Sequence, residues 1–386
     1  MQHAPAPFKP IDSNFVDGMR GFSAIAVALY HTILFTGLTG ASAIAFPEIF
    51  ALLRNGYLGV PIFIVLSGFV LMLPVIRGGS YRLPKGFKLY FGRRFRRIVP
   101  PYWVALFLSI ALIAAVPVLQ AESGTKWDDK IPVTADAIFG HFFLIQNFIG
   151  GMTTINGPMW SVAIEWQIYF LMPLLLLPLW RKFGASTAVT ITAILTLSPS
   201  AIGSALNAAG VESIFPAPPR DYEIHHPWFL LLFAFGMVAA ELATNARVHA
   251  KWYWVPAVPT TYFMFAYADF AIANREVSET LVGASTALLV VWFAKNGSSV
   301  FTRLLASKPA VHLGNMSYSI YLIHSPLLAL GNLLLLPLKL ELGVHLALMF
   351  FLVLPLALVI SWMFHYLVER RFMTAHQSEL RSEKLV

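Results

Sequence analysis

The strongest constraint on the fold of this chain is a series of apolar runs, each long enough to cross about 30 Å of hydrocarbon. Hydrophobic residues make up 58% of the 386 positions and charged residues only 12%, which excludes an ordinary soluble domain. Backbone polar groups inside a bilayer must bond within their own segment, so these runs predict helices. We expect an all-α, polytopic transmembrane helical bundle of about ten spans, at residues 15–37, 57–77, 100–119, 162–181, 185–206, 227–244, 253–272, 278–294, 316–337 and 345–367.

The distribution of basic residues predicts how these spans are oriented. With the N-terminus in the cytoplasm, twenty Lys and Arg fall on the cytoplasmic side and six on the other. An even number of spans then places both termini in the cytoplasm. The net charge of +8 therefore reflects topology, and we expect no nucleic-acid partner. The chain divides into a cytoplasmic N-terminal segment (1–14), a transmembrane domain (15–370) and a cytoplasmic C-terminal tail (371–386).

The first apolar run carries two ionisable residues, Arg20 and His31. On a helix, eleven positions place them within roughly 20° of each other and about 16 Å apart along the axis. An ionisable side chain in a span suggests a functional site by default, because its desolvation is costly. The alternative is a structural histidine that bonds a neighbouring helix.

A basic cluster, YFGRRFRRIVPPYW (residues 90–103), lies on the predicted cytoplasmic side. It contains Arg93, Arg94 and Arg97, directly before a helix that we expect to begin at Pro100 and Pro101. Arginine forks match phosphate oxygens, and a helix N-terminus would add N–H donors for the same anion. The cluster therefore suggests a site for a phosphate-bearing cofactor, although anionic lipid and topology could equally explain it.

The stretch NGPMWSVAIEWQIYFLMPLLL (residues 156–176) places Glu165 near the outer end of the fourth span, with Tyr169 one turn further on. A carboxylate at this depth needs a partner, and His31, also predicted in the outer half of the membrane, could be that partner. A carboxylate that bonds one imidazole nitrogen would orient the base. Glu165 could instead bond Ser, Tyr or Trp groups to lock the bundle together.

Two further stretches place small or polar residues on helical faces. GNMSYSIYLIHSPLL (residues 314–328) brings Ser317, Tyr321, His324 and Ser325 to one face, which lines either a packed interface or a wet cavity. In GVPIFIVLSGFVL (residues 59–71), the small pair beginning at Ser67 allows a helix or a slender ligand to approach closely.

Two predicted outer loops are long, at residues 120–160 and 207–226. Loops of this length in a compact protein are usually functional or disordered. Aromatic residues lie in or beside them, and these residues could stack on sugar rings. For most of them we favour the alternative, an interfacial aromatic belt; they are Trp127, Trp160, Tyr222 and Trp228.

Together these stretches resemble a known family. The segment Asp-Gly-x-Arg-Gly with His31 after it, then FIVLSGF, the RRxxRIxP pattern of residues 93–100, WSVAIEWQIYFLMP and SYSIYLIHSP occur in this order. They are similar to the motifs of the acyltransferase-3 family of integral membrane carbohydrate O-acyltransferases, and the resemblance covers roughly residues 15–370. Pro61 departs from the family pattern, since we expect many relatives to carry Asp there, and no role is assigned to it.

The resemblance implies an acyl-CoA donor, most simply acetyl-CoA, used from the cytoplasm to acylate hydroxyls of surface polysaccharides, lipopolysaccharide, Nod factors or glycosylated small molecules. It also implies roles for Arg20, His31, Arg94 and Arg97, and together with the patterns above it gives site candidates in three groups. The catalytic candidates are His31, Glu165 and Arg20; the candidates for binding the cofactor are Arg94, Arg97, Arg93 and Ser67; those for binding the acceptor are Tyr169, Trp160, Tyr321 and His324. The chain ends without the esterase-like domain of some relatives, so we expect it to complete transfer alone or with a partner.

We therefore expect a membrane O-acyltransferase in a bacterial-type plasma membrane, with a carbohydrate or glycolipid acceptor and, as further partners, polysaccharide assembly proteins. His31 would act as a general base or would accept the acyl group itself. With no cysteine and no ligand spacing in the sequence, we assign no metal. The alternatives are a proton-coupled transporter of an anionic or glycosylated solute, and a flippase or lipid-binding subunit of an assembly complex.

Overall fold

The structure is a computed structural model, and it describes residues 11–149, 153–211, 226–249, 251, 257, 260–261 and 274–373. The expected span at 253–272 lies almost entirely outside the described residues. Tyr222 and the chain after residue 373 lie outside them too.

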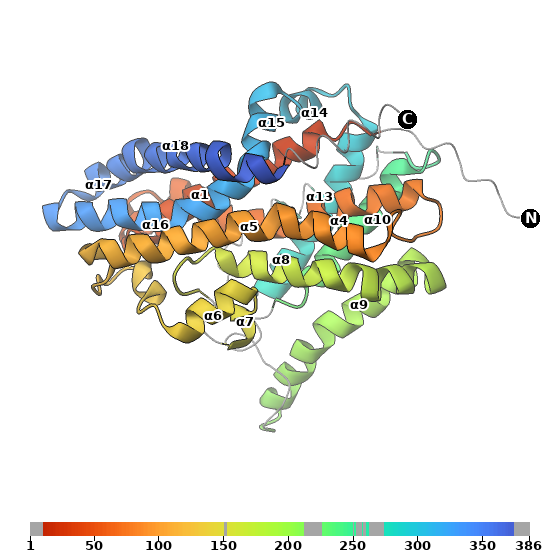
Figure 1. Cartoon of the computed structure of the whole chain (residues 1–386), viewed down its shortest axis with the longest axis horizontal. Helices are drawn as coiled ribbons and strands as arrows, with labels where there is room; N and C mark the ends of the chain where they lie inside the picture. The colour runs from red at the N-terminus through yellow and green to blue at the C-terminus, as the bar shows by residue number, and fades with distance from the viewer. Residues whose placement is uncertain are drawn as a thin grey trace, which may run out of the picture. The chain divides into compact units, whose positions relative to one another are not determined.

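The described residues form helices and no strand. The α-helices are α1 (Asn14–Leu34), α2 (Thr39–Ala45), α3 (Pro47–Arg54), α4 (Gly59–Arg77), α5 (Gly86–Ala115), α6 (Ala135–Phe143), α7 (Gln146–Ile149), α8 (Met159–Leu171), α9 (Leu177–Ala208), α10 (Phe229–Thr244), α13 (Arg275–Lys295), α14 (Val300–Leu305), α15 (Lys308–Asn315), α16 (Ser317–Leu335), α17 (Leu342–Leu348) and α18 (Leu354–Phe364) (Figure 1). Shorter 3-10 or π turns are η1 (Asn55–Leu58), η2 (Pro117–Leu119), η3 (Lys126–Lys130), η4 (Met172–Leu176), η6 (Leu336–Leu338), η7 (Met349–Val353) and η8 (His365–Glu369).

Many of these helices are suited to a membrane. Within the described chain, six continuous helical stretches are long and apolar enough to cross a bilayer: Pro47–Arg77, Gly86–Ala115, Met159–Ala208, Arg275–Lys295, Ser317–Leu338 and Leu342–Met373. A seventh forms if α1 and α2, bent by 102°, count as one span. The expected class, an all-α transmembrane bundle, is confirmed, while the number of ten spans and the cytoplasmic termini stay predictions.

Several predicted boundaries match the helices and one does not. The stretch Met159–Ala208 is broken at Gly184, whose φ of +79° is not helical, which separates the spans expected at 162–181 and 185–206. The span expected to begin at Pro100 was placed wrongly at its start, because α5 begins at Gly86 and continues through both prolines. Prolines are tolerated inside membrane helices, where neighbouring groups satisfy the backbone that they leave unbonded, so Pro100 and Pro101 do not mark the start of α5.

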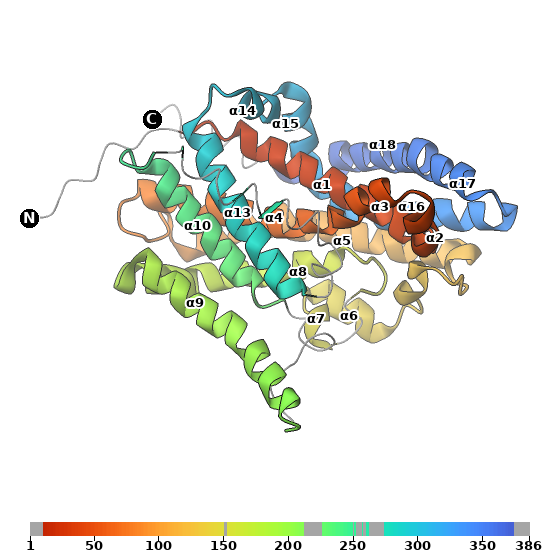
Figure 2. The same cartoon turned by 180° about the vertical axis from the view of Figure 1, so that it is seen from behind.

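By their contacts, the residues cluster into two compact units of interleaved segments. Unit 1 comprises residues 1–23, 58–87 and 167–314, and unit 2 comprises residues 24–57, 88–166 and 315–386. In unit 1, α10 packs against α4, α13 and α9. Helices α4, α10 and α13 lie side by side in both views (Figure 1, Figure 2). Glycines allow this packing: a Cβ on Gly68 of α4 would clash with the Phe233 carbonyl, and one on Gly236 of α10 with the Val65 carbonyl.

In unit 2, α16 packs against α18 and the π turn η7, and it also contacts η2 at the far end of α5 (Figure 1). A Cβ on Gly331 of α16 would clash with the Val353 side chain, so this glycine permits the close approach. Helix α16 is buried over most of its length, and its buried residues include the polar Ser319, His324 and Ser325. Buried polar groups in a span need partners, and those partners define the candidate site.

Candidate functional site

The centre of the candidate site in unit 2 is a pair of histidines. His31 Nδ1 on α1 lies 2.8 Å from His324 Nε2 on α16, and the two rings stack with centroids 5.0 Å apart. His324 is fully buried, whereas His31 stays partly accessible. Among the described residues, the side-chain hydrogen-bond partner of His31 is therefore His324, and not Glu165, for which the sequence had suggested that place.

The hydrogen bonds fix the tautomer of both rings. His324 Nδ1 lies 2.7 Å from the Ile320 carbonyl, which can only accept, so Nδ1 carries the proton. In a neutral His324, Nε2 is then the acceptor, and His31 Nδ1 must donate to it. This leaves Nε2 of His31 with its lone pair free. The arrangement gives His31 the geometry of an oriented base, in which His324 is the orienting residue.

A row of polar side chains continues from His324 along α16 and α8. The Tyr321 ring lies 6.1 Å from the His324 ring, and Tyr321 Oη lies 2.6 Å from Ser161 Oγ on α8. Glu165, one turn further along α8, acts electrostatically on Tyr321. On α5, the charges of both Glu165 and Arg94 act electrostatically on the Tyr90 hydroxyl. The polar row of direct contacts therefore comprises His324, Tyr321 and Ser161, and the charges of Glu165 and Arg94 act on tyrosines of the same unit.

The predicted cofactor-binding arginines lie inside α5 rather than before a helix N-terminus. Arg93, Arg94 and Arg97 are half-buried, while Arg96 is exposed. Since the helix has already begun at Gly86, the backbone N–H groups after residue 99 are not an exposed N-terminal set. The expected contribution of a helix N-terminus to anion binding is therefore wrong, and the arginine forks are the donors that remain.

Three predicted residues belong to unit 1. Arg20 is half-buried on α1, and its Nε has no hydrogen-bond partner among the described residues. Ser67 is buried on α4, beside the glycine that packs against α10, so the close approach at this small pair is made by a helix. Tyr169 is buried on α8, with its ring 6.4 Å from that of Phe233.

For two aromatic residues of the predicted outer loops, the expectation of an interfacial belt is wrong. Trp127 is fully buried, donates from Nε1 to the Leu119 carbonyl at 2.9 Å, and packs against Phe35. Trp228 is 1% exposed. These two are therefore core residues and not members of an interfacial belt, because each indole finds a partner inside the protein. Trp160 is half-buried on α8.

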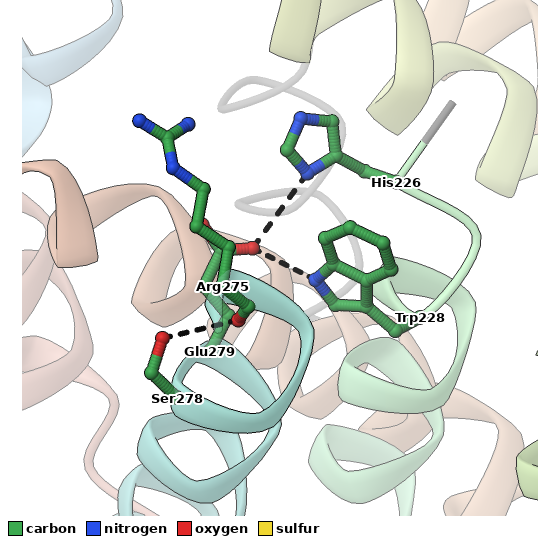
Figure 3. Close-up of polar contacts among 5 residues, drawn as sticks. All are labelled: His226, Trp228, Arg275, Ser278 and Glu279. Atoms are coloured by element: carbon green, nitrogen blue, oxygen red, sulfur yellow. Dashed lines mark hydrogen bonds and ion pairs between the residues drawn. The ribbon is translucent and has the colours of Figure 1, made fainter. Parts of the chain in front are cut away.

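Trp228 belongs to a buried cluster in unit 1 that the sequence did not indicate. Glu279 on α13 is 2% exposed and accepts a 2.7 Å hydrogen bond from Trp228 Nε1, and His226 Nδ1 lies 3.6 Å from the same carboxylate oxygen (Figure 3). In Figure 3 the Arg275 guanidinium points away from this carboxylate, and Ser278 Oγ donates to the Arg275 carbonyl at 3.1 Å. The contacts fasten α13 to the segment that leads into α10.

The loop between α5 and α8 holds titratable groups that sequence analysis also missed. Burial lowers the pKa of Lys130 to about 8, and Lys126 acts in the same direction. Burial likewise lowers the pKa of His141 to about 4. Burial alone would raise the pKa of Asp128, but hydrogen bonds from Ser123 and the following backbone N–H groups lower it. In the sequence, Lys130 is indistinguishable from any other outer-loop charge.

Comparison with known proteins identifies the family of this chain. The acyltransferase-3 family model, described as an acyltransferase domain, matches residues 13–366. Over 82% of its length, the chain is 22% identical to "Putative peptidoglycan O-acetyltransferase YrhL" of Bacillus subtilis and 23% identical to "O-acetyltransferase OatA" of Staphylococcus aureus. "Peptidoglycan O-acetyltransferase OatA" of Listeria monocytogenes is also 23% identical over the same share.

The chain spans about half the length of these curated relatives, 49%, 51% and 49% respectively. No solved structure matches it. The family match covers nearly the whole chain, including α1 with His31 and α16 with His324. The chain therefore belongs to the acyltransferase-3 family.

Proposed function

We propose that this protein is an acyl-CoA-dependent membrane O-acyltransferase. It moves an acyl group, most simply acetyl, to a hydroxyl of a carbohydrate acceptor such as a surface polysaccharide, lipopolysaccharide or glycolipid. The observation that carries the proposal is the free Nε2 of His31, which the hydrogen bonds to His324 and on to the Ile320 carbonyl leave as a base. Alcohols attack thioesters poorly unless a base removes their proton, so an oriented imidazole supplies what this reaction needs.

The reaction proceeds in two proton-balanced steps. His31 Nε2 takes the proton of the acceptor hydroxyl while its oxygen attacks the thioester carbonyl carbon. The tetrahedral intermediate then expels the CoA sulfur, which receives the proton back from His31. Throughout, Nδ1 of His31 keeps its bond to His324, which prevents the ring from turning and fixes which nitrogen reacts.

Arg94 and Arg97 are the proposed donors to the phosphates of CoA. Both are half-buried on α5, where the charges of Arg94 and Glu165 act on Tyr90, and Glu165 also acts on Tyr321 beside His324. Polar side chains between these helices would line the path of the slender pantetheine arm of the donor. Trp160, on the same α8, is the proposed stacking surface for a sugar ring.

Two relatives are named as peptidoglycan O-acetyltransferases. Within the carbohydrate class, a peptidoglycan sugar is therefore the first acceptor to test. Purified protein in detergent is incubated with acetyl-CoA and a soluble glycan, and free CoA thiol and acetylated glycan are measured. Equal amounts of both products support the proposal. If the protein in vesicles moves solute and releases no thiol, the function is transport instead.

A cellular experiment identifies the acceptor. Deletion of the gene should remove an acyl mass from one surface glycan, detected by mass spectrometry. Wild-type protein should restore that mass, whereas His31→Gln should not. Restoration by the His31 variant would contradict the proposed site.

A further inference from the structure

Lys130 is a buried cation that takes no part in the reaction steps described above. The residue is 4% exposed, at the end of η3 in the loop between α5 and α8. Asp129 acts on it electrostatically, but that carboxylate lies 2.6 Å from Lys126 Nζ. In the part of the chain that the structure describes, no hydrogen bond or ion pair is made by Lys130 Nζ. Burying a charge without a partner is costly, which suggests that this ammonium has a ligand.

A second unpartnered donor lies beside it. Ser325 Oγ on α16 is fully buried and has no hydrogen-bond partner among the described residues. The two donors meet at Gly157: a Cβ built there would lie 3.4 Å from Lys130 Nζ and 3.9 Å from Ser325 Oγ. The same Cβ would lie 3.1 Å from Lys130 Cε, so the absence of a side chain at Gly157 lets Lys130 pack closely here and brings its ammonium and the Ser325 hydroxyl to one place.

Hydrogen bonds hold the backbone next to Gly157 in place. The Ile155 N–H donates to the Lys130 carbonyl at 2.9 Å, with Ile155 at a φ of +63°, a costly conformation for a β-branched residue. The Asn156 side chain donates to the Leu322 carbonyl of α16 at 2.8 Å. These bonds fix Gly157 over the turn of α16 that carries Ser325. Strained residues that neighbours hold in place are often found at functional sites.

Two observations relate these donors to the histidine pair. Ser325 directly follows His324, and Lys130 acts electrostatically on His31. Both donors belong to unit 2, as do the two histidines. In acyl transfer, the atom that needs such donors is the carbonyl oxygen, because it becomes negative in the tetrahedral intermediate.

We propose that Lys130 Nζ and Ser325 Oγ, two buried donors beside Gly157, form the oxyanion site for the acyl group under transfer. The inference rests on the proposed function. When the acceptor oxygen bonds to the carbonyl carbon, the π electrons move to the carbonyl oxygen, which accepts hydrogen bonds from both donors. When the carbon–sulfur bond breaks, the electrons return, and both residues keep their protons throughout.

Three variants test the site. Lys130→Met and Ser325→Ala each remove one donor, while Gly157→Ala keeps both donors and should displace the lysine, because the added methyl would lie 3.1 Å from Lys130 Cε. Each should lower kcat about 10²-fold or more, the usual effect of losing one oxyanion donor, with little change in the KM for acetyl-CoA. Suitable controls are Lys339→Met, an exposed loop lysine of the same unit, and Gly297→Ala, which has open space around it.

Heat stability separates this role from a structural one. Replacing an unpaired buried charge by an apolar side chain of similar size usually leaves a protein as stable or more so. Lys130→Met should therefore be at least as resistant to heat as wild type, and yet much slower. Wild-type rates in Gly157→Ala and Ser325→Ala, or a loss in Lys130→Met that merely follows a loss of folded protein, would overturn the oxyanion site. If wild type itself transfers no acyl group, the proposed function fails instead.

Discussion

His31 Nδ1 and His324 Nε2 are 2.8 Å apart, although 293 positions separate the two residues along the chain. Because the Ile320 carbonyl fixes the proton on the other nitrogen of His324, the direction of the bond between the rings is determined. The free nitrogen of His31 is therefore a consequence of packing α1 against α16, and the account of catalysis depends on this contact.

The orienting role of His324 predicts a graded response to substitution. His324→Phe keeps a ring of similar size but removes the acceptor, so His31 can adopt either tautomer, and kcat should fall about 10-fold to 100-fold. His324→Gln can still present an oxygen to His31 Nδ1 and should retain more activity than His324→Phe. Both kcat and KM for acetyl-CoA should be measured. Equal losses in the two variants would contradict an orienting hydrogen bond.

The donor site predicts effects on KM. Replacing Arg94 or Arg97 by Ala should raise the KM for acetyl-CoA about 10-fold or more, since each charge-assisted contact is worth about 1.5–3 kcal/mol. Lys at these positions should restore binding only partly, because it lacks the planar fork. Arg96→Ala is the matched control, because Arg96 is exposed on the same helix. A normal KM in the Arg94→Ala/Arg97→Ala double variant would return the cluster to a role in topology.

The lowered pKa of Lys130 predicts an alkaline decline in activity. Burial lowers this pKa from 10.5 to about 8, with Asp129 opposing the change and Lys126 and His141 nearby. Because the ammonium is the donor, kcat should fall as the pH rises through about 8. In Lys130→Arg, a variant that stays protonated, the residual activity should show no decline there. A wild-type profile that stays flat to pH 9.5 would contradict the prediction.

The stability of the fold should depend on pH in the opposite direction. In the unfolded chain Lys130 keeps its proton up to about 10.5, so between about pH 8 and 10.5 the unfolded state binds more protons than the folded state. This residue's contribution to stability therefore rises with pH in that window, while activity falls. Loss of activity there cannot be attributed to unfolding driven by Lys130.

The Glu279 cluster predicts an effect on stability rather than on chemistry. Glu279→Leu leaves the Trp228 indole N–H buried without its acceptor, which should cost about 1–3 kcal/mol, whereas Glu279→Gln keeps an oxygen there and should cost less. Thermal unfolding in detergent measures the difference. The KM for acetyl-CoA, measured on the folded protein, should be unchanged in both variants. A Glu279→Gln protein that is stable but inactive would contradict a purely structural role.

The sequence predicted the class of fold because apolar runs of this length have few structural solutions in a bilayer. It also identified His31 and His324 separately, since ionisable residues stand out in apolar helices. Their pairing depends on how α1 and α16 pack, which one sequence does not show. For the same reason, the sequence does not show that His31 bonds His324 rather than Glu165.

Two other features were missed for physical reasons. The pair Pro100–Pro101 predicts a helix start, but prolines are tolerated inside membrane helices because neighbouring groups satisfy the backbone that they leave unbonded. Lys130 looked like an ordinary loop charge, because burial of a loop by its own backbone contacts leaves no periodic signal.

The most direct test of the account is His31→Gln, studied with a labelled acyl donor. Gln is polar and of similar size, but it cannot take a proton near neutral pH. The variant should insert and bind acetyl-CoA normally, and it should lose at least about 10²-fold in transfer. Wild type with donor alone should carry no acid-labile label, as expected for a general base. Label on wild type that disappears in His31→Gln would indicate an acyl-imidazole instead. A His31→Gln protein that keeps most of its transfer activity would contradict the central claim that this imidazole carries the reaction.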